Sequence, residues 1–170
     1  MPLTLQQVVE QLNVDEPDYP ALATLGPEAI PHLAVLVQGD DPNLAAKAAY
    51  LASLIDSDDS PVVIAVAAAS PDETVRVAAG AGLRNLMPPE AAPMVDRLLD
   101  DEDVGVRKQA LHAVAHLGLV ALEPKLKRMA ANDPEEGLRE LARQGLQRFT
   151  ELRSAGKKDT PASGTKPDEE

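Results

Sequence analysis

The sequence predicts an all-α protein in which paired helices stack into a short α-solenoid behind an N-terminal capping segment. Three observations support this fold class. Apolar residues and prolines recur about every 31 residues, which is typical of stacked repeats. The chain has two Tyr, one Phe and no Trp, so alanine, leucine and valine must fill a core of thin, close helices. No stretch alternates apolar and polar residues for long enough to predict a strand.

The repeat is clearest in the second helix of each predicted pair. An apolar residue is followed by alanine after four positions and by a larger apolar residue after eleven. The four series begin at Leu44, Val75, Val106 and Leu138, continue with Ala48, Ala79, Ala110 and Ala142, and end with Ile55, Leu86, Leu117 and Phe149. The apolar positions form a stripe about 80° wide on a helix. One pair alone cannot bury such a stripe, but a stacked neighbour can.

The predicted elements follow in order along the chain. Residues 1–25 hold N-terminal capping helices, with capping-box spacing between Thr4 and Gln7. Four helix pairs then occupy residues 26–56, 57–87, 88–118 and 119–153. Their first helices are predicted near 27–38, 61–69, 89–99 and 119–131, and their second helices near 43–55, 71–86, 102–117 and 134–153. The remaining residues, 154–170, are small and polar, which predicts a disordered tail.

Several helix starts and contacts can be predicted from local signals. Ser60-Pro61, Ser70-Pro71 and Asp133-Pro134 each place a capping residue before a proline at the expected first helical position. Ser70 and Glu73 also have capping-box spacing. Gly80 and Gly82 lower the helix propensity of residues 71–86, so we expect them to permit a close contact with a neighbouring helix.

Composition excludes several classes of protein. The chain has no cysteine, which rules out disulfides, thiolate metal sites and cysteine nucleophiles. The first residues lack a basic start and an apolar block, and the run 62–69 is too short to cross a bilayer, so we expect a cytoplasmic protein that does not bind membranes. The net charge is −12, and residues 1–75 hold 12 acids against one base. Such an acidic body repels phosphate backbones, which argues against nucleic-acid binding.

The repeated residues resemble those of a known family. The third pair has a proline in the first helix, an aspartate at the turn and a Val-Arg pair in the second helix: Pro93, Asp101, Val106 and Arg107. The fourth pair matches with Pro124, Asp133, Leu138 and Arg139, whereas the second has Ser70 at the aspartate position and the first has Gly39 and Ala45. This pattern over residues 26–153 resembles HEAT repeats, particularly the HEAT-like repeats found in phycobilisome lyases.

That resemblance has structural implications. It implies a short right-handed, armadillo-like α-solenoid of about four HEAT-like pairs, with the second helices on the concave face. It also implies a structural Asp/Arg ladder that links neighbouring turns through Arg76, Asp101, Arg107, Asp133 and Arg139.

Two surfaces are candidates for binding. Polar residues at corresponding positions of the second helices would lie on the concave face: Tyr50, Arg84, Asn85, Lys108, His112, His116, Gln144 and Arg148. Acidic residues gather in the turns within pairs, at Asp40, Asp41, Asp72, Glu73, residues 100–103, Asp133, Glu135 and Glu136. A basic partner could bind this acidic ridge. Simple solvation explains the polar concave residues as well as partner binding does. The preference for acids at helix starts explains most of the charge in the turns.

No motif predicts catalysis or a cofactor. His112 and His116 are four residues apart and could reach one metal ion, but no glutamate follows the first histidine and no third ligand is evident. We therefore expect no metal site, no cofactor and no catalytic residue. The favoured function is a protein-protein interaction scaffold or adaptor, and the alternative is an accessory factor of the chromophore-lyase or cofactor-maturation type. The oligomeric state is open, with a monomer favoured.

Overall fold

The computed structural model describes residues 1–158, and every regular element in that range is helical. The prediction of an all-α fold is therefore confirmed. The ten α-helices in these residues are α1 (Leu5–Leu12), α2 (Tyr19–Ala23), α3 (Ile30–Val37), α4 (Pro42–Ser53), α5 (Ser60–Ala68), α6 (Glu73–Gly82), α7 (Pro88–Leu98), α8 (Val104–Leu117), α9 (Glu123–Asn132) and α10 (Glu136–Lys158). Short 3₁₀ turns occupy Gly26–Ala29, Leu83–Asn85 and Val120–Leu122.

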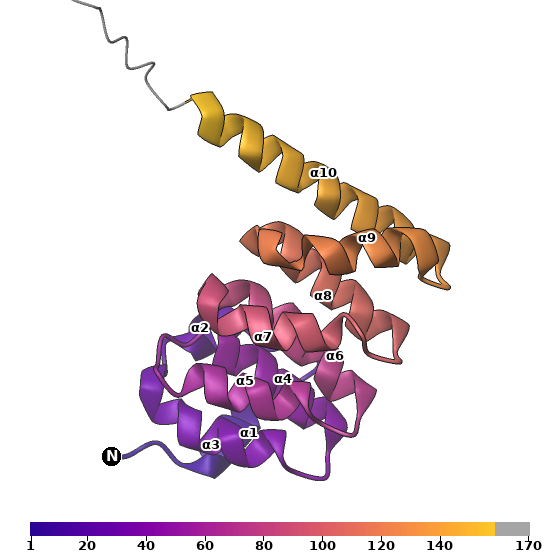
Figure 1. Ribbon diagram of the computed structural model, residues 1–170. Coiled ribbons are helices and arrows are strands. Elements are labelled where there is room, and N and C mark those ends of the chain that lie inside the picture. The colour runs from indigo at the N-terminus through magenta and orange to yellow at the C-terminus, as the bar shows by residue number, and fades with distance from the viewer. Residues whose placement is uncertain (159–170) are drawn as a thin grey trace, which may run out of the picture.

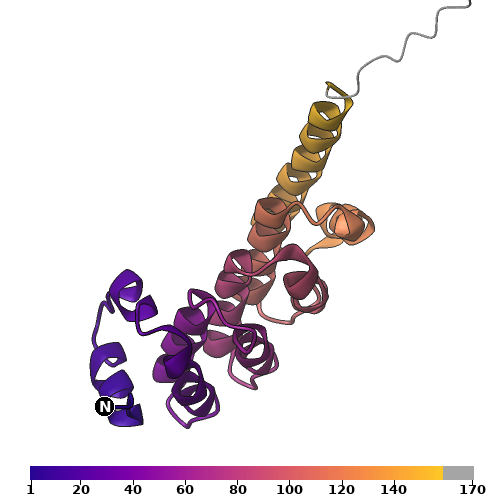
Figure 2. The same ribbon diagram turned by 90° about the vertical axis from the view of Figure 1, so that its left-hand side faces the viewer.

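The helices from α3 onwards form four antiparallel pairs, α3–α4, α5–α6, α7–α8 and α9–α10, stacked in chain order (Figure 1). The second helices α4, α6, α8 and α10 pack against one another in sequence, and α3, α5, α7 and α9 lie beside them (Figure 2). Val75, Val106 and Leu138 of the apolar stripes are buried between these layers. The stripe that one pair cannot cover is thus covered by its neighbours.

Glycines bring the second helices close together. A Cβ atom built on Gly80 would lie 2.8 Å from Cβ of Gln109 in α8, and one on Gly82 would lie 2.8 Å from Cβ of Ser53 in α4. Real Cβ atoms do not approach this closely, so both positions need glycine for the observed packing. The contact that the sequence predicted for these two glycines is confirmed.

The N-terminal helices pack on α4 rather than extending the stack. Val8, Leu12 and Leu22 bury their side chains there, and the indigo segment stands beside the second helices in Figure 2. The capping box at the start of α1 is confirmed, because Thr4 Oγ1 accepts a hydrogen bond from the Gln7 amide and Gln7 Oε1 accepts one from the Thr4 amide.

Two helices that were predicted to begin at a proline begin two residues later. Helix α6 begins at Glu73, after Asp72, whose carboxylate accepts a hydrogen bond from the Thr74 amide at 2.8 Å. Helix α10 begins at Glu136. In both cases the proline lies in the turn before the helix. The preceding Ser70 or Asp133 stabilises that turn by accepting a hydrogen bond from the amide two residues later.

Helices α3 and α9 begin three and four residues later than predicted, after 3₁₀ turns, α8 begins two residues later, and α6 ends at Gly82, four residues early. Further departures lie at the start of α5 and the end of α10. Ser60 is itself the first residue of α5, and its hydroxyl donates to the Ile55 carbonyl at 2.7 Å instead of capping the helix. Helix α10 continues to residue 158, so the predicted tail was wrong for residues 154–158. The yellow end of α10 projects past the other helices in Figure 1, and the rest of that predicted tail lies outside the described residues.

In residues 1–158, no helix combines the length and the apolar character needed to cross a membrane.

Candidate functional site

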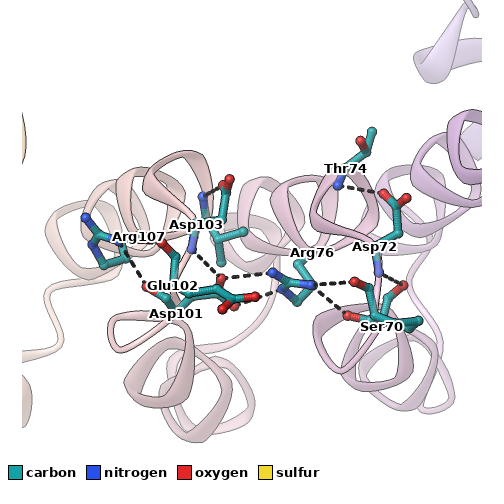
Figure 3. A network of polar contacts seen from close by, with 10 residues as sticks. Ser70, Asp72, Thr74, Arg76, Asp101, Glu102, Asp103 and Arg107 are labelled. Atoms are coloured by element: carbon teal, nitrogen blue, oxygen red, sulfur yellow. Dashed lines mark hydrogen bonds and ion pairs between the residues drawn. The ribbon is translucent and has the colours of Figure 1, made fainter.

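A ladder of ion pairs joins the turns of successive pairs along one edge of the stack. Figure 3 shows the step between Arg76 and Asp101. Arg76 Nε and Nη2 donate to the Asp101 carboxylate at 2.9 and 3.1 Å. Arg107 makes the same two contacts with Asp133, at 3.0 and 3.2 Å. The side chains of both pairs are at most 12% exposed, so these bidentate pairs are poorly screened by solvent.

Each arginine of the ladder also closes the turn of its own pair. Arg76 Nη1 donates to two backbone carbonyl oxygens, those of Ser70 and Pro71, at 3.0 and 3.1 Å. Arg107 and Arg139 contact the carbonyl oxygens at the same two offsets. The structure thus brings the five predicted ladder residues together, and Asp101 contacts Arg107 through its backbone oxygen while its carboxylate faces Arg76.

Opposing effects act on the pKa of Asp101. Burial raises it, whereas the hydrogen bonds from Arg76 and from the Asp103 amide, together with the charges of Arg76 and Arg107, lower it. The lowering effects prevail, so the pKa lies below its ordinary value. The carboxylate is therefore held in its charged form by the ladder.

The second-helix face, which we define as the exposed side of α4, α6, α8 and α10 together with the turn Leu83–Asn85, holds the other predicted site residues. At its N-terminal end, Tyr50 of α4 packs edge-on against Tyr19 of α2, with ring centroids 4.9 Å apart and planes at 81°. Lys47 Nζ donates to the Val14 carbonyl in the same segment. The N-terminal helices therefore occupy this end of the face, and part of the Tyr50 ring is covered.

A basic group lies in the middle of the second-helix face. His112 of α8 is half-buried, and burial and then the charges of Arg84 and Lys108 lower its pKa. The charges of Arg84 and Lys108 thus disfavour a third positive charge at His112. Asn85 donates to Ser53 Oγ at 3.0 Å, which joins this region to α4. The group can accept a carboxylate, because it offers two charged donors and a neutral imidazole.

A hollow of about 390 Å³ lies next to the basic group, between α8 and α10. It is lined by Lys108, by the apolar residues Val104, Leu138 and Leu141, and by Glu135 and Gly137. The valine is 42% exposed. Val104 and Leu141 were not identified from the sequence. Val104 could have been found, because it is an apolar residue that lies outside the buried stripe of its helix.

The remaining predicted residues line the exposed surface of α8 and α10. His116 is exposed, Gln144 donates to Glu140 at 3.4 Å, and Arg148 lies 3.7 Å from Glu151. Within residues 1–158, no group of three or more histidine or carboxylate side chains is placed to hold a metal ion. The pair His112 and His116 therefore has no third ligand in this part of the chain.

Comparisons with known proteins agree with this architecture. The family model for HEAT repeats matches residues 60–147, just over half of the chain. No curated protein sequence matches the chain significantly. Among solved structures, one similar chain comes from the complex of CpcE and CpcF of phycocyanin lyase from Nostoc sp. PCC7120. It has 21% identity and a TM-score of 0.70, and the alignment covers 84% of this chain and 97% of that one. At this identity the likeness concerns the fold.

Proposed function

Because the chain belongs to the HEAT-repeat family, we propose that it is a non-catalytic interaction scaffold or adaptor that binds a partner protein through the second-helix face. The observation that carries this proposal is the basic group of Arg84, Lys108 and His112 beside an apolar hollow. The molecule carries a net charge of −12, so a cationic patch next to exposed apolar side chains is a local exception. Such a surface suits a partner whose own surface carries negative charge next to apolar side chains.

The geometry favours a partner segment with an acidic residue next to an apolar one. A carboxylate would pair with Lys108 and Arg84, while an aliphatic side chain would enter the hollow against Val104 and Leu141. Binding energy at such interfaces comes from a few well-packed contacts rather than from total area. The similar chain in the phycocyanin lyase structure belongs to a complex of two different proteins, which supports a protein partner for this one.

Crosslinking and pulldown from native lysate, read by mass spectrometry, test the proposal. We expect one stoichiometric partner for the wild type and its loss in an Arg84→Ala/Lys108→Ala/His112→Ala variant. A Lys127→Ala/Arg128→Ala variant is the matched control, because it removes two exposed cations from α9, on the first-helix side. Retention of the partner by the triple variant would rule out the second-helix face. Loss in both variants would indicate a general effect of charge.

A second candidate function is an accessory role in attaching or handling a chromophore. It is supported by the fold similarity to a chain of the phycocyanin lyase complex. His112, His116 and Tyr50 would be the residues that contact such a ligand. The test is the visible absorbance of an added open-chain tetrapyrrole: a shift that His112→Ala abolishes would favour this role, and an unchanged spectrum would exclude it.

A further inference from the structure

The ladder is interrupted at one step, between the first and second helix pairs. Ala45 stands where Arg76, Arg107 and Arg139 stand in the later pairs, and Ser70 stands where Asp101 and Asp133 stand. Ser70 keeps the local part of the role, because its hydroxyl accepts a hydrogen bond from the Asp72 amide at 3.2 Å. Neither the guanidinium nor its carboxylate partner is present at this step.

An open groove lies where the missing pair would be. It has a volume of about 600 Å³ and is lined by the two turns and by residues of the helices next to them: Val37, Gln38, Gly39, Asp40, Pro42, Val66, Ala69, Ser70, Pro71, Asp72 and Val75. The equivalent groove between the third and fourth pairs measures about 330 Å³ and contains Arg107 and Asp133. The volume of the groove is thus nearly twice as large at the step where the ladder pair is absent.

The polar groups that hold a guanidinium elsewhere are still in place. In three pairs, arginine Nη1 donates to the carbonyl oxygens six and five residues before it. At the interrupted step these positions are Gly39 and Asp40, and no hydrogen bond reaches either oxygen from residues 1–158. The carboxylates of Asp40 and Asp72 also line the groove. This end of the groove therefore offers the carbonyl oxygens of Gly39 and Asp40 next to two acidic residues.

The outer rim of the same groove is apolar. In the fourth pair, Lys125 contacts Asp96 and Asp100 at 2.7 and 2.6 Å and closes the rim. The corresponding residue in the second pair is Val62, which is 62% exposed and lies one turn before Val66 in α5. Val66 lines the groove and is 41% exposed. A side chain entering here would meet aliphatic surface along its stem and acceptors at its tip.

We propose that this groove is a docking site for an arginine side chain of a partner protein. Its guanidinium takes the position that Arg76 and Arg107 fill at the later steps, and its methylene stem lies along Val62 and Val66. Arginine fits better than lysine, because a planar fork of donors matches two adjacent carbonyls and a carboxylate, whereas an ammonium group is a point charge. The strong negative charge of residues 1–75 attracts such a partner. The groove lies on the turn edge, so the proposal is independent of the second-helix face.

The test is an NMR titration of the isotope-labelled full chain with N-acetyl-arginine methylamide. We expect selective shifts of the amides of Gly39, Asp40, Ser70 and Asp72. The citrulline analogue has the same shape without the charge, and we expect it to bind at least about tenfold more weakly. Filling the groove from within, by Ala45→Arg together with Ser70→Asp, should abolish the selective shifts.

A second variant covers the case in which the double substitution does not fold. Asp40→Asn with Asp72→Asn removes both groove charges but keeps a capping side chain at the start of α6, and we expect it to weaken binding. The control is Glu102→Gln with Asp103→Asn, which removes two carboxylates beside a step where the ladder pair is present. We expect this control to bind as the wild type does. Equal shifts at every acidic turn, equal binding of citrulline, or no selective shift at all would overturn the proposal.

Discussion

At the residue scale, the guanidinium of Arg107 meets four oxygen atoms from two helix pairs. Two belong to the Asp133 carboxylate and two are backbone carbonyls of its own turn. Lysine has a compact ammonium group that cannot reproduce this fork. The ladder residues could be predicted because they match the positions that the resemblance to HEAT repeats implies for an Asp/Arg ladder. The structure adds that Arg76 and Arg107 each pair with the aspartate of the next helix pair.

Arg107→Lys should therefore lower the free energy of unfolding by about 1–3 kcal/mol, because charge-assisted hydrogen bonds are lost while the charge is kept. Urea denaturation measures the change. Arg143→Lys is the matched control, because its pair with Glu140 is exposed, and we expect a change below about 0.5 kcal/mol. Equal effects of the two substitutions would show that the ladder contributes no more than a surface pair.

The low pKa of Asp101 predicts how stability depends on pH. A carboxylate whose pKa is lower in the folded state binds fewer protons there than in the unfolded chain. Its stabilising contribution is complete above the unfolded pKa of about 3.9 and is lost as the pH falls through the lower folded pKa. The difference in unfolding free energy between the wild type and Asp101→Asn should therefore shrink below about pH 4. A constant difference would mean that the charge of Asp101 is not what stabilises the fold.

Other residue contacts could not be predicted from the sequence. Tyr50 was expected on an open face, yet it packs against Tyr19, because the docking position of the N-terminal helices depends on tertiary packing. The hollow between Val104 and Leu141 depends in the same way on how α8 and α10 cross. Neither feature recurs along the chain, so the repeat gave no information about them.

At the element scale, Gly80 controls how closely α6 and α8 approach. Alanine would raise the helix propensity by about 1 kcal/mol, but its Cβ would lie 2.8 Å from Cβ of Gln109, which is fixed to the backbone. We expect Gly80→Ala to lower the unfolding free energy by about 1–3 kcal/mol, as overpacking does. A Cβ on Gly137 in α10 meets no atom within 4 Å, so thermal melting should show Gly137→Ala unchanged or stabilised. A stabilised Gly80→Ala variant would mean that the helices can separate at little cost.

The sequence predicted which helices form more reliably than it predicted their first and last residues. The repeat placed all four pairs, but prolines that looked like first helical residues proved to lie in the preceding turns of α6 and α10. The end of α10 was missed for a different reason. Residues 154–158 are mostly small or polar, which is typical of a tail, yet they continue the helix beyond Arg153, which pairs with Glu123 of α9.

At the scale of the whole molecule, the N-terminal helices cover one end of the second-helix face. Deleting residues 1–25 would expose the apolar surface against which Val8, Leu12 and Leu22 are buried. Burial of each of these side chains contributes at most about 1.5–3 kcal/mol to the free energy of unfolding. We expect the truncated chain to stay helical but to melt at a clearly lower temperature, as followed by circular dichroism. Leu5→Ala, at an exposed site of α1, should have little effect, and an unchanged melting temperature of the truncated chain would contradict the packing described for α1 and α2.

The interrupted step of the ladder also affects how a long ligand can align with the turn edge. A perfectly periodic edge offers a long ligand several equivalent alignments that differ by one repeat, and nothing in the array distinguishes them. Ala45 and Ser70 break this translational symmetry once, near one end. The two ends of the turn edge therefore differ. A long ligand that recognises the irregular step can bind along the repeats in only one register.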